Sequence, residues 1–266
     1  MSNAPTRPEV ADQESSGVAP APARLARGTR ARPRLLGELA IVLILVFCYD
    51  WVQGLATASR GAAVMHGLEI LRWENGFHLD VELSYNQWLS SHSTLADIAS
   101  WYYQLAHLTV TLLVLLACYV WRPSHYRAAR NALVLINSIA LVIFWVFPTA
   151  PPRLLPGLGF VDTTQRMGVA SSAPDPYAAM PSLHTAWAVW TLVVMLMMVR
   201  RRWLKVLWVA YPVTTILVIV GTGNHYVLDV ILGTALTVIA ALFTTLLPAL
   251  LRSERARAYV GDNANP

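Results

Sequence analysis

The strongest constraint in this sequence is a series of six apolar segments, each long enough to cross a lipid bilayer. A hydrocarbon core about 30 Å thick requires roughly 20 apolar residues in a helix. The chain is 56% hydrophobic and 13% charged, whereas a soluble domain is about a quarter charged. The sequence therefore predicts an all-α polytopic membrane protein, a bundle of six transmembrane helices. The segments cover approximately residues 37–57, 98–120, 131–147, 183–199, 203–221 and 226–250.

The two ends of the chain have the composition of tails. Residues 1–34 are rich in Ala, Pro, Ser and Arg, and such a segment cannot bury a core, so we expect a disordered basic tail. Residues 253–266 form a second tail, which leaves 35–252 as the membrane domain. A basic stretch, an apolar segment and Ala56-Thr57-Ala58 also resemble a secretory signal with its cleavage site. The long preceding tail and the polar residues inside the apolar segment favour a retained anchor.

A mixed stretch, Gly61 to Ser93, separates the first two apolar segments. Its tryptophans at positions 73 and 88 are typical of a membrane interface. We expect an interfacial amphipathic segment that lies on the membrane surface. Its polar residues Glu74, His78 and Asp80 belong on a solvated face, with the lining of a substrate entrance as the alternative.

The distribution of positive residues predicts the orientation. Sixteen of the 20 Lys and Arg residues lie in residues 1–34, 121–130, 200–205 and 251–266. These segments share one side of the membrane if six spans alternate in direction, and cytoplasmic loops are enriched in Lys and Arg. We expect both termini in the cytoplasm. The use of Arg in place of Lys is typical of a GC-rich bacterial genome, which indicates a bacterial plasma membrane.

Polar motifs begin the fourth and sixth spans on the opposite, extracytoplasmic side. The first is Pro181-Ser182-Leu183-His184-Thr185, and the second is Gly223-Asn224-His225-Tyr226-Val227-Leu228-Asp229, followed by Gly233. Arg153, in a long Pro- and Gly-rich loop after the third span, lies on the same side. Long loops of this kind are often functional. Three polar elements from distant parts of the chain thus converge on one face of the membrane.

The histidines of these motifs have the chemistry of phosphate transfer. His225 and Asp229 are four residues apart, so on a helix their side chains can touch. A carboxylate that accepts the Nδ1 proton of His225 leaves Nε2 free as a nucleophile or base. His184, from another span, is placed to protonate a leaving oxygen.

Three further residues are candidate phosphate ligands. Ser182 precedes the fourth span, where a helix N-terminus favours anions. Arg153 can grip two phosphate oxygens, and Asn224 adjoins the candidate nucleophile. Each residue alone has an ordinary reading, Ser182 as a helix cap and Arg153 as a headgroup anchor, but their coincidence on one face favours a site.

Other polar residues carry weaker signals. Asp50 in the first span and Tyr226 beside His225 are candidate substrate contacts, although Asp50 could equally face interfacial water. Gln104, His107, Asn137 and Ser138 are expected to form interhelical hydrogen bonds. Cys48 and Cys118 both lie in apolar segments, which argues against a disulfide or zinc site. No motif predicts a metal, a cofactor or a nucleic-acid partner.

At Pro-Ser-Leu-His and His-Tyr-Val-Leu-Asp the sequence resembles the type 2 phosphatidic acid phosphatase superfamily of membrane lipid phosphatases and phosphotransferases. The resemblance covers about residues 37–250. It implies a six-helix core and a metal-independent mechanism through a phosphohistidine. By this resemblance His225 is the nucleophile, Asp229 its orienting partner and His184 the general acid.

The sequence departs from the usual motifs of that superfamily at two places. The third motif normally carries an Arg six residues before its His, and that position here is Ile219. The first motif pairs a Lys with a later Arg-Pro, and no such Lys precedes Arg153. The loop from Phe147 to Arg153 instead resembles the branch that contains inositol phosphorylceramide synthase, an inositolphosphotransferase-like branch.

The residues and the resemblance together predict an enzyme that transfers a phosphoryl or phospho-headgroup, of the phosphoinositol type, from a lipid donor to an alcohol. Hydrolysis of a lipid phosphate or isoprenoid diphosphate, with water as the acceptor, is the alternative. A transporter that relays protons is a remote third reading. Transporters often show repeated halves with interrupted spans, and no internal repeat is visible here.

Overall fold

The structure is a computed structural model that describes residues 33–56, 60–164 and 177–262. Most of the predicted N-terminal tail, and residues 57–58 of the alternative cleavage site, lie outside these ranges. The described residues form eight α-helices and a short 3-10 helix, η2 (Pro152–Leu154), with no strand. The predicted all-α class is therefore confirmed.

Six of the helices correspond to the six apolar segments of the sequence. They are α1 (Leu35–Ala56), α4 (Ser93–Trp121), α5 (Pro123–Val146), α6 (Leu183–Met198), α7 (Arg202–Gly221) and α8 (Val227–Asp262). Within the described part of the chain, α4, α5, α7 and the first 20 residues of α8 are long and apolar enough to cross a membrane. The chain is therefore an integral membrane protein. The remaining apolar helices are shorter, so six spans stay a prediction.

Large apolar side chains cover the outward faces of these helices. Such a surface is incompatible with water, where exposed apolar patches are normally limited to a few hundred Å², and it is the surface that lipid requires. Examples with more than half of the side chain exposed are Leu43, Phe47, Leu113, Trp145, Val206 and Ile239.

Inside the bundle, small residues allow close helix packing. α6 packs against α4, α7 and α8, and α5 packs against α1, α4 and α8. The alanines at positions 132, 140, 186 and 240 are almost completely buried in the core between α5, α6 and α8. Trp190 of α6 fills the space beside them and donates its indole N–H to the carbonyl oxygen of Ala129 at 2.9 Å. Small residues at helix interfaces are the usual way for membrane helices to approach each other.

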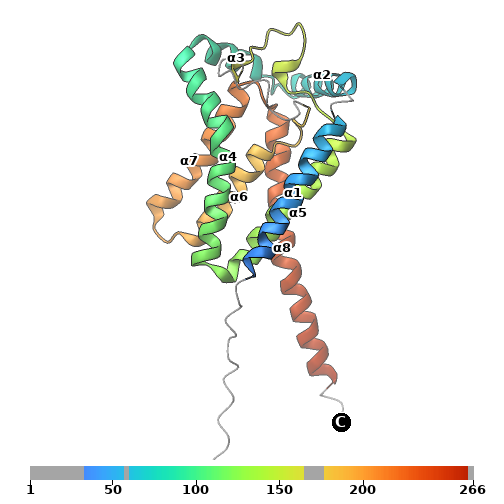
Figure 1. Cartoon of the computed structure of the whole chain (residues 1–266), viewed down its shortest axis with the longest axis vertical. Helices are drawn as coiled ribbons and strands as arrows, with labels where there is room; N and C mark the ends of the chain where they lie inside the picture. The colour runs from blue at the N-terminus through green and yellow to red at the C-terminus, as the bar shows by residue number, and fades with distance from the viewer. Residues whose placement is uncertain (1–32, 57–59, 165–176, 263–266) are drawn as a thin grey trace, which may run out of the picture. The chain divides into compact units, whose positions relative to one another are not determined.

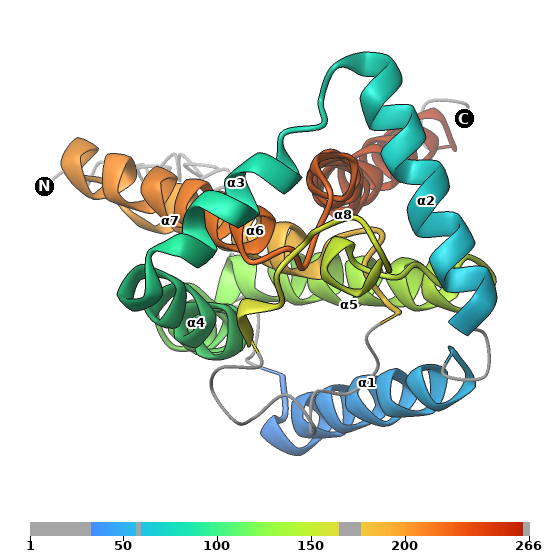
Figure 2. The same cartoon turned by 90° about the horizontal axis from the view of Figure 1, so that it is seen from above.

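Two further helices, α2 (Arg60–Phe77) and α3 (Glu82–Ser91), lie across one end of the bundle (Figures 1 and 2). α3 packs against α4 and α7, and α2 contacts α8. These helices occupy the stretch for which an interfacial amphipathic segment was predicted, and its place at the membrane surface stays a prediction. The expectation that Glu74 lies on a solvated face is wrong, because its side chain is fully buried against the N-terminus of α8. His78 and Asp80 are exposed.

A glycine in α2 permits this close contact. A Cβ atom at Gly67 would lie 2.6 Å from the hydroxyl oxygen of Tyr226 and 2.9 Å from the carbonyl oxygen of Ala150. Any side chain there would push α2 away from the loop that precedes α8. The end of the bundle that α2 and α3 cover is the end that carries both histidine motifs.

Candidate active site

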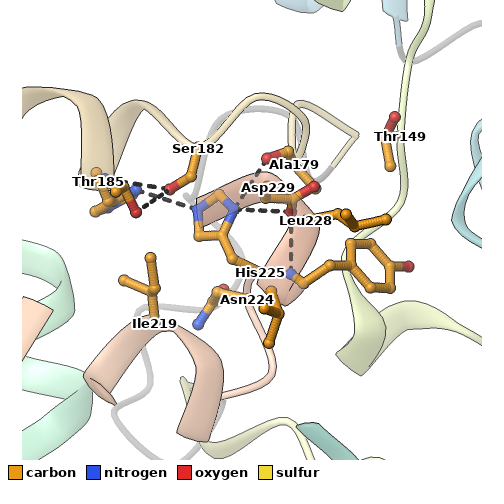
Figure 3. A network of polar contacts seen from close by, with 12 residues as sticks. Thr149, Ala179, Ser182, Thr185, Ile219, Asn224, His225, Leu228 and Asp229 are labelled. Atoms are coloured by element: carbon orange, nitrogen blue, oxygen red, sulfur yellow. Dashed lines mark hydrogen bonds and ion pairs between the residues drawn. The ribbon is translucent and has the colours of Figure 1, made fainter. Parts of the chain in front are cut away.

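His225 lies in the short connection between α7 and α8, and its ring is held by two acceptors. Nδ1 is 2.9 Å from the carbonyl oxygen of Ala179 and 3.2 Å from Oδ2 of Asp229 (Figure 3). A carbonyl oxygen can only accept, so Nδ1 carries the proton and donates it. Nε2 of the neutral ring then holds a free lone pair. The predicted contact between His225 and Asp229 is confirmed.

His184 faces that lone pair from α6. Its Nδ1 is 3.4 Å from Nε2 of His225, and with the tautomer above it is Nδ1–H of His184 that points at His225. The other ring nitrogen of His184 is buried, and the part of the chain that the structure describes offers it no hydrogen-bond partner. The two histidines, 41 residues apart in sequence, therefore meet as the motifs predicted.

The backbone of α8 passes directly against the start of α6. A Cβ atom at Gly233 would overlap the carbonyl oxygen of Ser182, so only glycine allows this approach. The N–H of Ser182 donates to the carbonyl oxygen of Asp229 at 3.2 Å. This contact joins the two motifs through their backbones, and it sets the separation of the two rings.

Ser182 caps α6, as its position predicted. Its hydroxyl oxygen accepts the N–H of Thr185 at 3.2 Å, and it also accepts the Thr185 hydroxyl at 3.2 Å. Both side chains are fully buried. A neutral hydroxyl thus marks the helix end next to His184, where backbone N–H groups and the helix dipole favour an anion.

Arg153 is fixed beside the residues that precede His225. Its N–H donates to the carbonyl oxygen of Gly223 at 2.9 Å, and its Nε donates to Oδ1 of Asn224 at 2.8 Å. One terminal nitrogen lies 2.7 Å from Oδ2 of Asp162, and both side chains of this ion pair are about 10% exposed. Asp162 is held in turn by the N–H and hydroxyl of Thr164. The guanidinium charge is therefore already shared with a fixed carboxylate.

Two other predicted site residues, Asn224 and Tyr226, make hydrogen bonds that hold the fold together. Asn224 is occupied on both sides of its amide, by Arg153 and by the hydroxyl of Thr222 at 2.8 Å. Tyr226 is fully buried and donates its hydroxyl to the carbonyl oxygen of Ala150 at 2.7 Å, which is the position of a packing residue, not of a lipid contact. The side chain of Asp50, in α1, lies outside the described residues.

Two residues of α4 also contact the site. The ring of Tyr103 stacks on that of His184 with centroids 4.4 Å apart, and the ring of His107 lies 4.1 Å away. His107 was expected to form an interhelical hydrogen bond, but its Nδ1 binds the carbonyl oxygen of Tyr103 within the same helix at 3.0 Å. These rings fix the plane of the His184 imidazole. Their spacing of four residues places them on one face of α4. This spacing is visible in the sequence and could have indicated that the two rings act together.

Comparison with known proteins identifies the family of this chain. Residues 68–243 match the PAP2 superfamily, the type 2 phosphatidic acid phosphatases. The crystal structure of Aquifex aeolicus LpxE is similar at 16% identity and a TM-score of 0.45, over 57% of this chain and 84% of that chain. A comparison with curated proteins found no match. Because the family match spans most of the chain, the protein belongs to the PAP2 superfamily.

Proposed function

We propose that this protein transfers a phosphoryl or phospho-headgroup from a lipid donor to an alcohol acceptor through a phosphohistidine at His225. The observation that carries the proposal is the pairing of the two imidazoles. The lone pair on Nε2 of His225 faces Nδ1 of His184 at 3.4 Å, while Asp229 and Ala179 hold the opposite nitrogen of His225. A phosphorus atom does not fit within this 3.4 Å contact, so the donor must separate the two rings before the nucleophile and the acid can act on opposite sides of phosphorus.

In the first half of the reaction Nε2 of His225 attacks phosphorus, and the bond from phosphorus to the leaving oxygen breaks. His184 acts as the general acid and gives one proton to that oxygen. The positive charge that develops on the His225 ring is balanced by Asp229, 3.2 Å away. The acceptor then attacks phosphorus and gives its proton to His184, and the bond between His225 and phosphorus breaks.

The charges around Arg153 favour a donor with one negative charge. Its guanidinium is already paired with Asp162 at 2.7 Å, and Ile219 stands where the superfamily usually has a second Arg. A dianionic phosphomonoester would add repulsion against Asp162 that a singly charged phosphodiester largely avoids. A phosphodiester donor with an inositol-type headgroup agrees with the inositolphosphotransferase-like loop from Phe147 to Arg153.

Hydrolysis is the second candidate function, and membership in the PAP2 superfamily favours it. The two histidines serve water as well as an alcohol, because either nucleophile needs only a base and a phosphorylated His225. In that case the product is free phosphate or a free phospho-headgroup. The distinction rests on which acceptor reaches the site, not on the arrangement of the histidines.

We further infer six spans, with both termini in the cytoplasm and the histidines at the extracytoplasmic face of a bacterial plasma membrane. The support is the bias of 16 of 20 Lys and Arg residues toward one set of connecting segments. Labelling of single cysteines in intact cells tests this orientation. Labelling of a cysteine at exposed Asp80, with protection of one at position 202, is the expected result.

The function is tested with purified protein in detergent. Phosphatidate, an isoprenyl diphosphate and phosphatidylinositol are offered as donors, with and without a diacylglycerol acceptor whose acyl chains differ in mass from those of the donors. New phospholipid, free phosphate and free phospho-headgroup are measured together. New phospholipid formed only with diacylglycerol supports transfer, and water-soluble products alone support hydrolysis.

The variant His225→Ala distinguishes turnover by this protein from turnover by a contaminating enzyme. Without the nucleophile, we expect turnover to fall at least a thousandfold. The matched control is His78→Ala, which removes an exposed histidine of the same end of the bundle. Turnover that survives in His225→Ala would overturn the histidine mechanism.

A further inference from the structure

Three carboxylates bind three successive backbone N–H groups at the start of α8. Asp229 accepts the N–H of Tyr226 at 3.0 Å, Glu82 that of Val227 at 2.9 Å, and Glu74 that of Leu228 at 2.7 Å. Asp229 belongs to α8, whereas the two glutamates come from α3 and α2. All three are at most 1% exposed. The N-terminus of α8 is therefore bound from three directions.

Three ionised carboxylates would carry more negative charge than the N-terminus of one helix can balance. A helix N-terminus carries roughly half a positive charge, and three buried ionised carboxylates would repel one another strongly. Burial, together with the neighbouring Glu82 carboxyl, raises the pKa of Glu74 from 4.5 to about 9, and among the described residues Oε2 of Glu74 has no other hydrogen-bond partner. The charged or titratable groups that face Glu74 are Glu82 on α3, Asp229 on α8 and the Tyr226 phenol. None of them supplies a positive charge.

We propose that Glu74 and Glu82 are positioning residues, which share one proton and hold the start of α8 so that His225 stays aligned with His184. The amides they bind are the second and third after His225, so a shift of α8 moves the nucleophile directly. A carboxylic acid at Glu74 donates to the Glu82 carboxylate while its other oxygen accepts from Leu228. This inference rests on the proposed function only where it is tested by kcat.

The pairing also explains why α2 and α3 cover this end of the bundle. Each helix contributes one buried glutamate to the same two-residue stretch of α8, and the glycine at position 67 lets α2 approach. A buried polar pair of this kind is costly when one partner is lost, because the other remains without its hydrogen bond.

The test compares Glu74→Gln, Glu74→Ala and Glu82→Gln with the wild type between pH 6 and pH 10. A glutamine at position 74 accepts from Leu228 and donates to Glu82 at every pH. We expect Glu74→Gln to keep kcat within about threefold at pH 7 and to remove the fall in kcat that the wild type shows as pH rises through about 9. Glu74→Ala should lower kcat at least tenfold with KM within about threefold, and Glu82→Gln should also remove the alkaline fall.

A second readout does not depend on the substrate. The folded protein keeps a proton on Glu74 that the unfolded chain releases above pH 4.5, so stability is full below that pH and falls as pH rises toward 9. The thermal unfolding midpoint of the wild type should decline over this range more steeply than that of Glu74→Gln. The control is Asp80→Asn, an exposed acid between α2 and α3, which should keep the wild-type profile.

The two readouts separate failure of this inference from failure of the proposed function. If no donor is turned over but the unfolding midpoints diverge as described, the shared proton stands and the function fails. Equal pH profiles for the wild type and Glu74→Gln, in kcat and in unfolding, would overturn the shared proton. Unchanged kcat in a folded Glu74→Ala variant would overturn the positioning role.

Discussion

The N-termini of α6 and α8 meet at the same site, yet they are capped in opposite ways. α6 is capped by one neutral hydroxyl, that of Ser182, which comes from the residue just before the helix. α8 is capped by three buried carboxylates, two of which come from other helices. Each helix end holds one of the paired histidines.

This difference assigns different tasks to the two helix ends. Backbone N–H groups and the helix dipole make an N-terminus attractive to phosphate, but the carboxylates already bind those groups in α8. Only the α6 end keeps a neutral cap, so the phosphate of the donor should approach α6, beside Ser182 and His184. The α8 end instead fixes His225, the proposed nucleophile. The following three predictions test this division.

The largest effect is expected from Asp229→Asn, which changes the α8 end. The amide keeps the size of the side chain but cannot balance the positive charge on His225, and it can reverse the tautomer that Asp229 and Ala179 impose. By analogy with other histidine–aspartate pairs, we expect kcat to fall roughly 10³- to 10⁴-fold. Single-turnover rates with the preferred donor measure this loss.

The control for that variant is Asp97→Asn, which removes an exposed carboxylate of α4 and should leave kcat within twofold. Fluorescence-detected size exclusion checks that both variants fold. A folded Asp229→Asn variant with nearly normal kcat would mean that α8 does not fix the nucleophile through this residue.

A smaller effect is expected from Ser182→Ala, which changes the α6 end. Loss of the cap should lower stability by about 1 kcal/mol, and loss of the hydroxyl beside the phosphate should lower kcat/KM about tenfold. The comparison variant is Ser84→Ala, whose exposed hydroxyl binds a carbonyl in the first turn of α3. If Ser182→Ala loses stability but keeps kcat/KM, the α6 end is a cap only and phosphate binds elsewhere.

The smallest effect is expected from Ile219→Arg, which adds positive charge near the α8 end. Ile219 is fully buried close to His225, and its carbonyl oxygen accepts the N–H groups of Asn224 and His225 (Figure 3). The new charge should raise kcat/KM for a phosphomonoester over a phosphodiester several-fold. Ile219→Met controls for the change in packing. If a folded Ile219→Arg variant keeps the wild-type ratio of kcat/KM for the two donors, charge at this position does not determine which donor is preferred.

The sequence predicted the helices and the paired histidine motifs of this site better than it predicted the residues that hold them in place. The apolar segments located the six long helices, and the spacing of His225 and Asp229 predicted their contact. These features are local, because a helix fixes which residues four apart share a face. The cap at Ser182 was predictable for the same reason.

The supporting residues depend on contacts between distant segments, for which the sequence carries no local signal. Glu74 and Glu82 lie in a stretch that reads as interfacial, and their partners are backbone amides 154 and 145 residues away. Asp162 likewise reads as an ordinary loop carboxylate until the fold brings it to Arg153. Tyr103 and His107 share a helix face, but only the rotation of α4 shows that this face meets His184.

Thr149 and Ala178 form an isolated β-bridge at the base of the connection between α5 and α6. Thr149 accepts the N–H of Ala179 at 3.1 Å and donates its own N–H to the carbonyl oxygen of Tyr177 at 2.7 Å. The carbonyl of Ala179 is also the partner of His225. The bridge therefore ties the carbonyl partner of the His225 ring to Thr149, in the segment that directly follows α5. A displacement of the end of α5 would therefore reach the His225 ring through Thr149 and Ala179.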